Sequence, residues 1–189
     1  LDLGGSEEDV KNAEGGIFVG ENGKLTRIKA LTQGFALFYA FITEGIGFKA
    51  VDGEGKTMAL AAYGDSYSPA YNSLKNYAPT VKGVNLVRRK KSFKMNVAVV
   101  NNYQRFIFND LHRIHSLVKR YSDRDVAAAT QRILEERVLE LVENALEKTG
   151  MNKLCLAGEV FMNVKLNKKL RELKKVKDIY IYPNPGDAG

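Results

Sequence analysis

Residues 154–189 have the sequence LCLAGEVFMNVKLNKKLRELKKVKDIYIYPNPGDAG, and this stretch decides the fold. The apolar run Leu154–Ala157 predicts a short strand that ends at Gly158, a helical pattern begins near Asn163, and Asp178–Tyr182 predicts a second strand. A strand, a helix and a strand in this order form a βαβ crossover, which joins parallel strands and is right-handed in nearly all proteins. We therefore expect an α/β fold.

The predicted crossover brings two loops, Gly158–Asn163 and Asn184–Gly189, to the carboxyl ends of their strands. Open α/β sheets bind their ligands at this edge. Backbone near Gly158 could approach a nucleotide's ribose or adenine, and Asn163 offers both a donor and an acceptor. Asp187 stands between small residues and could ligate a cation that carries the nucleotide's phosphates. These loops predict a nucleotide site, although ordinary turns share their composition.

The composition is that of a globular protein, with 44% hydrophobic and 10% aromatic residues among 189. No apolar run reaches the roughly eighteen residues of a membrane span, and no signal-peptide pattern is present, so we expect a cytoplasmic protein without a membrane partner. A single cysteine, Cys155, fits a reducing compartment, and its place in a predicted strand predicts a buried side chain. A start without methionine and an end within a loop lead us to expect a fragment.

The net charge of +7 is concentrated in two basic runs, Arg88–Lys94 and Lys165–Lys177. Such runs form either a nucleic-acid surface or the solvated face of a helix or loop. Aromatic residues do not alternate with these cations as a base-stacking platform requires. The pattern therefore favours the solvated face and leaves nucleic acid as the alternative partner.

The first third of the chain predicts a hairpin and two helices. Strands at Ile17–Val19 and Leu25–Ala30 flank an Asn-Gly turn, and Phe35–Ile46 is apolar nearly all round, which predicts a buried helix. Lys56–Tyr63 predicts a short helix that stops at Gly64. Upstream, Leu1–Gly5 resembles a strand that turns on two glycines.

Two further sites follow from these elements. Gly4 and Gly5 would let backbone N–H groups approach an anion, unless they only make a tight turn. Glu54 and Lys56 lie at the amino-terminal end of the predicted short helix, where free N–H groups favour anionic ligands. A favourable first-turn acid is the alternative interpretation of Glu54.

The middle of the chain predicts a strand at Met95–Val100 and an amphipathic helix at Tyr103–Tyr121. His112 and His115 would lie on that helix, and because no acidic or cysteine partner accompanies them we interpret them as surface residues rather than metal ligands. Ser122 and Asp125 resemble a capping box that opens a long helix, which runs to Thr149 and ends at Gly150.

Three segments, in the same order, resemble the O-carbamoyltransferases of the nodulation and antibiotic-tailoring type. These are TEGIGFKAVDGEGKTMALAAYGD (Thr43–Asp65), Ala127–Leu141 followed by LCLAGEVFMNVKLN (Leu154–Asn167), and YIYPNPGDAG (Tyr180–Gly189). The similarity covers most of the chain and is weakest in Tyr67–Tyr121.

This resemblance implies an actin/hexokinase-like (ribonuclease H-like) nucleotide-binding fold. The chain would be mostly its second half, with an irregular helical insertion, and its core is similar to the tRNA threonylcarbamoyl-adenosine synthase domain. It implies transfer of a carbamoyl group from carbamoyl phosphate, through a carbamoyl-adenylate made with ATP, to an acceptor hydroxyl of a small molecule. It implies a divalent metal, iron by resemblance, held by two histidines and an aspartate.

Site residues follow from the same resemblance. Gly158, Val160 and Asn163 match the family's nucleotide loop. Gly186 is expected to bind the cofactor as well, and Asp187 matches the metal-binding aspartate. Glu54 and Lys56 match a segment near the site and are the expected catalytic residues, and Gly4 and Gly5 match a phosphate-facing hairpin.

The chain also departs from the family pattern. The two metal-binding histidines and the carbamoyl-phosphate domain would lie outside it, in a missing amino-terminal lobe and a separate domain. Glu159 stands where the family has a second glycine, and Ala62 replaces a proline. We therefore expect an active parent and an incomplete fragment, divided into residues 1–66, 67–121 and 122–189. The alternatives are a tRNA-modification or nucleic-acid module of the same fold, and a degenerate nucleotide-binding domain.

Overall fold

The computed structural model describes residues 15–89, 91, 95–100, 103–108 and 111–183. The chain divides into two compact units. The first contains residues 1–34, 79–88 and 136–189, and the second contains residues 35–78 and 89–135. The predicted boundaries at residues 66 and 121 divide a larger fold into segments and stay a prediction. The two compact units are defined by contacts within this chain and have other boundaries. Predicted residues Gly4, Gly5, Gly186 and Asp187 lie outside the described residues.

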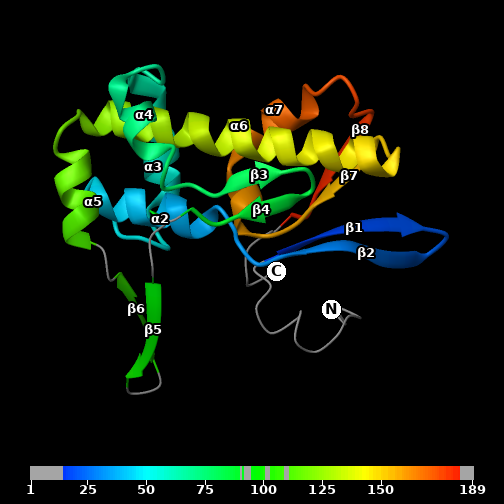
Figure 1. Ribbon diagram of the computed structural model, residues 1–189, viewed down its shortest axis with the longest axis horizontal. Helices are drawn as coiled ribbons and strands as arrows, with labels where there is room; N and C mark the ends of the chain where they lie inside the picture. Colours follow the sequence, from blue (N-terminus) through cyan, green and yellow to red (C-terminus); the bar gives the residue numbers. More distant parts are fainter. Residues whose placement is uncertain (1–14, 90, 92–94, 101–102, 109–110, 184–189) are drawn as a thin grey trace. The chain divides into compact units, whose positions relative to one another are not determined.

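The first unit is built from short strands, one crossover helix and the second half of a long helix (Figure 1). Its strands are β1 (Gly15–Glu21), β2 (Lys24–Leu31), β3 (Thr80–Lys82), β4 (Asn85–Val87), β7 (Lys153–Leu156) and β8 (Asp178–Ile181). Its helical elements are the short 3-10 helix η2 (Glu159–Met162), α7 (Val164–Arg171) and the carboxyl-terminal part of α6 (Asp123–Thr149).

The second unit is mainly helical. Its elements are α2 (Ala36–Gly45), α3 (Glu54–Leu60), η1 (Ala61–Tyr63), α4 (Pro69–Leu74), β5 (Met95–Val100), β6 (Tyr103–Phe108), α5 (Leu111–Val118) and the first half of α6. The described chain is therefore a mixed α/β protein with helices and two-stranded sheets. None of its described helices is both long and apolar enough to cross a bilayer.

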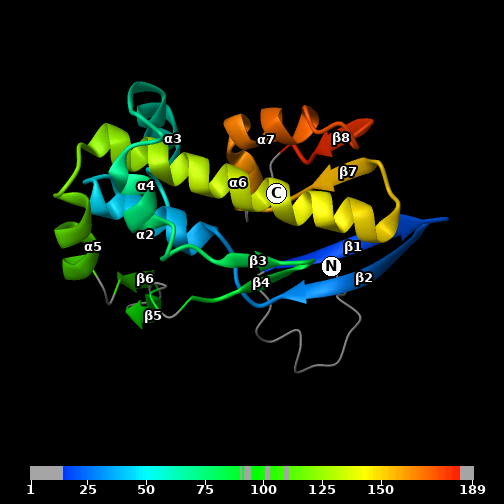
Figure 2. The ribbon, with the colours of Figure 1, turned by 45° about the horizontal axis from the view of Figure 1, so that its top comes forward.

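The predicted crossover is confirmed. Strand β7 pairs with β8 in parallel, from Lys153 opposite Asp178 to Leu156 opposite Ile181, and α7 lies beside the pair in both views (Figure 1, Figure 2). The side chains of Leu166 and Leu170 anchor α7, since both are completely buried. The other three pairs are antiparallel.

The predicted first hairpin is also confirmed. Strands β1 and β2 pair antiparallel up to Glu21 opposite Lys24, and the two turn residues, Asn22 (φ 51°) and Gly23 (φ 74°), both adopt the left-handed conformation. An Asn-Gly turn of this kind matches the twist of the strands that it joins, which is why the dipeptide predicts a hairpin.

The predictions for the long helix, for α2 and for α3 are confirmed, but the prediction of one helix over Tyr103–Tyr121 is wrong. Tyr103–Phe108 forms strand β6, paired antiparallel with β5, and only Leu111–Val118 is helical. The segment Tyr103–Phe108 is rich in aromatic and β-branched residues, which favour strands, so a neighbouring strand decides its conformation. The long helix α6 ends at Gly150, as predicted, and Gly150 adopts the left-handed conformation (φ 70°).

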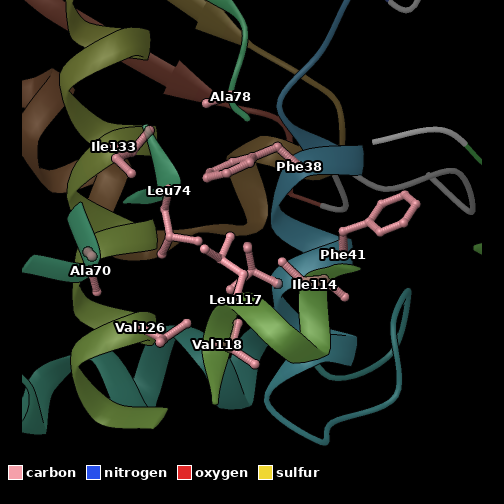
Figure 3. Packing of buried hydrophobic residues seen from close by; sticks show 12 residues of the cluster. Phe38, Phe41, Ala70, Leu74, Ala78, Ile114, Leu117, Val118, Val126 and Ile133 are labelled. Carbon is pink, nitrogen blue, oxygen red and sulfur yellow. The ribbon is translucent and has the colours of Figure 1, made fainter. Parts of the chain in front are cut away.

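The second unit has a continuous apolar core. The side chains of α2, α4 and α5 meet the first half of α6, and Figure 3 shows Leu74 extending toward Leu117 of α5. The completely buried members of this core are Phe41, Ile42, Ala70, Leu74, Ala78, Ile114, Val126 and Ala129. The core fixes the helices on which the segment Thr43–Asp65 is built.

The prediction that Cys155 is buried is wrong. Cys155 is exposed, opposite Tyr180 of β8, whose side chain is also exposed. The residue lies in a strand as expected, but a parallel sheet buries a side chain only where another layer covers that face. In the described part of the chain, the side chain of Leu156 is buried and that of the preceding Cys155 is exposed.

Candidate functional site

The turn after β7 is the better defined of the two predicted sites. Gly158 has φ 107° and ψ 156°, a conformation that residues with a Cβ atom adopt at a cost. The Phe161 N–H donates to the Gly158 carbonyl oxygen at 2.9 Å and closes the η2 turn. A Cβ built on Gly158 meets no atom within 4 Å, so space lies open in front of this backbone. A ligand can therefore approach it closely.

Asn163 connects this turn to α7. Its side-chain Oδ1 accepts a hydrogen bond from the Leu166 N–H at 3.0 Å and caps the helix. The sequence predicted a residue that gives both a donor and an acceptor to a ligand, and the structure uses the acceptor for the cap. Val160 is half-buried in η2, and Glu159 is exposed beside it. The structure thus brings Gly158, Val160 and Asn163 together in one turn.

Asn167 is a site residue that the sequence reasoning missed. Its Nδ2 donates to the Phe161 carbonyl oxygen at 2.7 Å, and its Oδ1 is buried without a hydrogen-bond partner. The side chain ties the η2 turn to the first turn of α7. The signal in the sequence is its place four residues after Asn163, because residues at this spacing lie on the same face of a helix.

Glu54 and Lys56 lie together at the start of α3, in the second compact unit. The Glu54 Oε1 accepts a hydrogen bond from the Val51 N–H at 2.7 Å, so this carboxylate is engaged with the preceding loop. Lys56 is exposed, with its Nζ 6.0 Å from the centre of the Phe48 ring. Glu44 and Val51, which shape this loop, were not predicted.

The described residues do not form a metal site. No group of three or more His, Cys, Asp or Glu side chains in the part of the chain that the structure describes could hold an ion. His112 and His115 are exposed on α5, in agreement with the interpretation as surface residues. Asp187, Gly186, Gly4 and Gly5 fall outside the described residues, so their roles stay predictions.

The segment Thr43–Asp65 is fixed to the amino-terminal end of α6. The Asp65 N–H donates to Asp125 Oδ1 at 2.8 Å, and the Asp125 N–H donates to Ser122 Oγ at 3.1 Å. The predicted capping box is therefore half present, because Ser122 caps the helix but the carboxylate of Asp125 turns to Asp65. The Asp65 N–H, followed by the Ser122 hydroxyl, holds the pKa of Asp125 below its ordinary value of 3.8.

This contact predicts a specific acid sensitivity. A carboxyl whose pKa is lowered by folding stabilises the protein above its ordinary pKa of 3.8, and the contribution disappears as the pH falls through the lower folded value. We expect Asp125→Asn to reduce the free energy of unfolding by less than about 1 kcal/mol at pH 7, because solvent screens this exposed group. The deficit should shrink towards zero in urea titrations at decreasing pH.

Asp123→Asn is the matched control, since Asp123 lies in the same first turn of α6. It removes an acidic charge near the helix dipole without removing the Asp65 contact. A deficit of Asp125→Asn that stays constant down to the lowest pH would contradict the proposed origin of the pKa shift.

Comparison with known proteins identifies relatives that match most of the chain. A family model described as "Carbamoyltransferase N-terminus" matches residues 16–189. The chain is 33% identical over 154 residues to an uncharacterized protein of Methanocaldococcus jannaschii, a match that covers 80% of this chain and 23% of that protein. It is 32% identical over 162 residues to an uncharacterized protein of Synechocystis, with 81% and 25% coverage.

A shorter match has a functional name. The chain is 42% identical over 66 residues to the nodulation protein NolO of Bradyrhizobium diazoefficiens, which covers 35% of this chain and 12% of that protein. The chain spans about a quarter of the length of the two longer-matching relatives.

Proposed function

The chain belongs to the carbamoyltransferase family, and from this membership we propose that it is part of an enzyme that transfers an ATP-activated carbamoyl group to an acceptor hydroxyl. Carbamoyl phosphate is the proposed carbamoyl source, and a hydroxyl-bearing small molecule is the proposed acceptor. The observation that carries the ATP assignment is the turn at Gly158, whose backbone adopts a conformation suited to glycine and borders open space at the carboxyl end of a parallel strand.

The turn fits a nucleotide in three respects. The absence of a Cβ at Gly158 lets a planar base or a ribose lie directly against the backbone. Asn163 and Asn167 hold the turn in place, one by capping α7 and the other by binding the Phe161 carbonyl oxygen. A pre-formed turn does not have to be ordered when the ligand binds, which favours affinity.

The described residues alone do not supply a set of ligands for iron. Asp187 stays the proposed ligand of this chain, and its histidine partners are proposed to lie elsewhere in the larger protein. We also propose the actin/hexokinase-like fold for the larger protein, which is supported here by the parallel crossover β7–α7–β8.

Lys56 is the proposed phosphate-binding cation of the second unit. The Lys56 side chain is exposed, and among the described residues it forms no ion pair with a carboxylate. Lys49, by contrast, pairs with Asp52 at 3.2 Å. An exposed ammonium group at the start of a helix suits a phosphate. Glu54, the other predicted catalytic residue, accepts the hydrogen bond from the Val51 N–H.

ATP binding to the whole protein, measured by calorimetry with and without Mn²⁺, tests the nucleotide assignment. We expect Gly158→Ala to weaken ATP binding about tenfold or more, because a Cβ would enter the space next to the ligand and strain the backbone. Gly150→Ala is the control, because Gly150 also has a positive φ (70°) and lies at the end of α6, away from the turn.

Both substitutions place a Cβ atom at a positive φ and are expected to lower stability, so ATP affinity, and not stability, is the quantity to compare. Equal ATP affinities of the two variants would reject the site at Gly158. Loss of the metal-dependent part of binding in Asp187→Ala would support the metal role of Asp187, and unchanged metal dependence would reject it.

An RNA-modifying module of the same fold is the second candidate. It is favoured by a basic surface on and after α7, where the exposed cations are Lys168, Lys169, Arg171, Lys174, Lys175 and Lys177. Two acids moderate this charge, since Lys168 contacts Glu172 and Lys175 contacts Glu147. A filter-binding assay with tRNA separates the candidates, because several phosphate contacts produce a steep loss of affinity with salt.

A degenerate nucleotide-binding domain is the third candidate, and Glu159 favours it. The residue is exposed next to Gly158 and adds a negative charge where a phosphate would approach. If Glu159 has closed the site, Glu159→Gly should restore ATP binding to a chain that otherwise has none. An unchanged affinity removes this argument.

A further inference from the structure

The loop between α2 and α3 contains a strained residue. Val51 has φ 69°, in the left-handed region, and its side chain is 47% exposed. A β-branched residue in this region is an outlier, because its side chain crowds the backbone. Val51 does not belong to the buried core, so core packing does not account for this conformation. Its conformation must therefore be imposed by its neighbours.

Two carboxylates hold the backbone around Val51. The Glu54 Oε1 accepts a hydrogen bond from the Val51 N–H at 2.7 Å, and the Glu44 Oε2 accepts one from the Ala50 N–H at 2.8 Å. Glu44 is near the end of α2 and Glu54 is the first residue of α3. Consecutive N–H groups are thus bound by acids from the two helices that flank the loop.

The frame around the loop is rigid. The Thr43 and Thr57 hydroxyls hydrogen-bond to each other at 2.9 Å, and both residues are completely buried between α2 and α3. Gly53 packs so closely that a Cβ atom there would lie 2.8 Å from the Lys49 carbonyl oxygen and 2.9 Å from the Phe48 Cβ. The helices therefore fix both carboxylates in place, and the loop follows them.

We propose that Glu54 is a positioning residue, which together with Glu44 holds Val51 in its left-handed conformation, and that it is not a proton donor or acceptor in the reaction. The proposal rests on the proposed function, since it assigns the Phe48–Gly53 loop, and not the Glu54 carboxylate, to the transferase site. Lys56, two residues further on, has an exposed side chain and is the proposed ligand-binding cation of this segment.

A double-mutant cycle between Glu54 and Val51 tests the proposal through stability. Glu54→Ala should lower the melting temperature of the protein by about 3–5 °C, because a hydrogen bond to a charged group is lost and the strain at Val51 remains. Glu54→Gln keeps an acceptor oxygen and should recover most of this loss. Val51→Gly should raise the melting temperature by about 2–4 °C, since glycine adopts the left-handed conformation without strain.

The decisive variant is Glu54→Ala combined with Val51→Gly. With glycine at position 51 the loop keeps its conformation without the carboxylate, so removal of Glu54 should cost less than half as much as in the wild-type background. Carbamoyl transfer by the whole protein should recover together with stability, so the double variant should be more active than Glu54→Ala. Asp52→Ala, an exposed acid of the same loop, is the matched control and should change the melting temperature little.

Two results would overturn the proposal. Additive effects of Glu54→Ala and Val51→Gly on the melting temperature would show that the carboxylate does not hold Val51. A Glu54→Gln variant with wild-type stability but abolished carbamoyl transfer, unrescued by Val51→Gly, would show that the carboxylate takes part in proton transfer. The stability cycle needs no substrate, so its outcome stands even if the protein has another activity.

Discussion

Gly64→Ala is expected to destabilise the second compact unit by more than about 3 kcal/mol, at the upper end of the overpacking range. An ideal Cβ on Gly64 would lie 2.0 Å from the Arg124 carbonyl oxygen and 2.8 Å from the Asp125 N–H nitrogen. Both atoms belong to the backbone at the start of α6, which Ser122 caps, so they cannot turn aside as a flexible side chain would. The measurement is the urea-unfolding midpoint and slope.

Gly55→Ala is the matched control for this substitution. Gly55 lies in α3, and a Cβ there meets no atom within 4 Å. Because alanine is the better helix former, Gly55→Ala should stabilise the protein by about 0.5–1 kcal/mol. If Gly64→Ala were tolerated as well as Gly55→Ala, the close contact between the Thr43–Asp65 segment and α6 would be contradicted.

Gly64 also illustrates what a sequence pattern can and cannot predict. The position of Gly64 after a helical segment correctly predicted the end of that segment. The prediction assumed that glycine is needed for its backbone conformation, and the structure shows another reason. A helix-ending glycine usually takes the left-handed conformation, whereas Gly64 has φ −113° and ψ 167°, which any residue can adopt. Space, rather than backbone conformation, requires glycine here. Only the packing of α6, distant in sequence, supplies that information.

Local chemistry predicted most of the described elements. The Asn22-Gly23 turn, the cap at Ser122 and the end of α6 at Gly150 depend on residues that are neighbours in the chain, so the sequence contains their cause. The helix predicted over Tyr103–Tyr121 failed because an apolar stripe in a short segment does not distinguish a strand from a helix. The prediction that Cys155 is buried failed because the burial of a strand residue depends on the layer that covers its face of the sheet.

Part of the candidate site was predictable because it, too, depends on residues that are neighbours in the chain. Gly158 and Asn163 follow a strand and open a helix, and the structure places them in one turn. The role of Asn167 depends on a contact with the Phe161 backbone, which helix spacing suggests but does not specify. The strain at Val51 left no trace in the sequence, since valine is an unlikely choice for a left-handed position and only a structure reveals it.

Phe41→Ala is the second substitution from which we expect a large loss, about 3–5 kcal/mol, in the free energy of unfolding. Phe41 is completely buried in α2 and belongs to the cluster that joins α2, α4, α5 and α6 (Figure 3). Truncation removes the transfer free energy of the ring and leaves a cavity among close-packed neighbours. Denaturant titration followed by far-UV circular dichroism measures this loss.

The effect should extend to the loop that Glu54 holds. Phe41 lies three residues before Glu44, and Thr43 between them pairs with Thr57 of α3, so loosening α2 also loosens the frame of the Phe48–Gly53 loop. Amide hydrogen exchange at Ala50 and Val51 should therefore accelerate in Phe41→Ala. Tyr63→Ala, whose side chain is 75% exposed, is the control and should leave both stability and exchange nearly unchanged. If Phe41→Ala lowered stability while exchange at Ala50 and Val51 stayed slow, the loop would be held independently of the core.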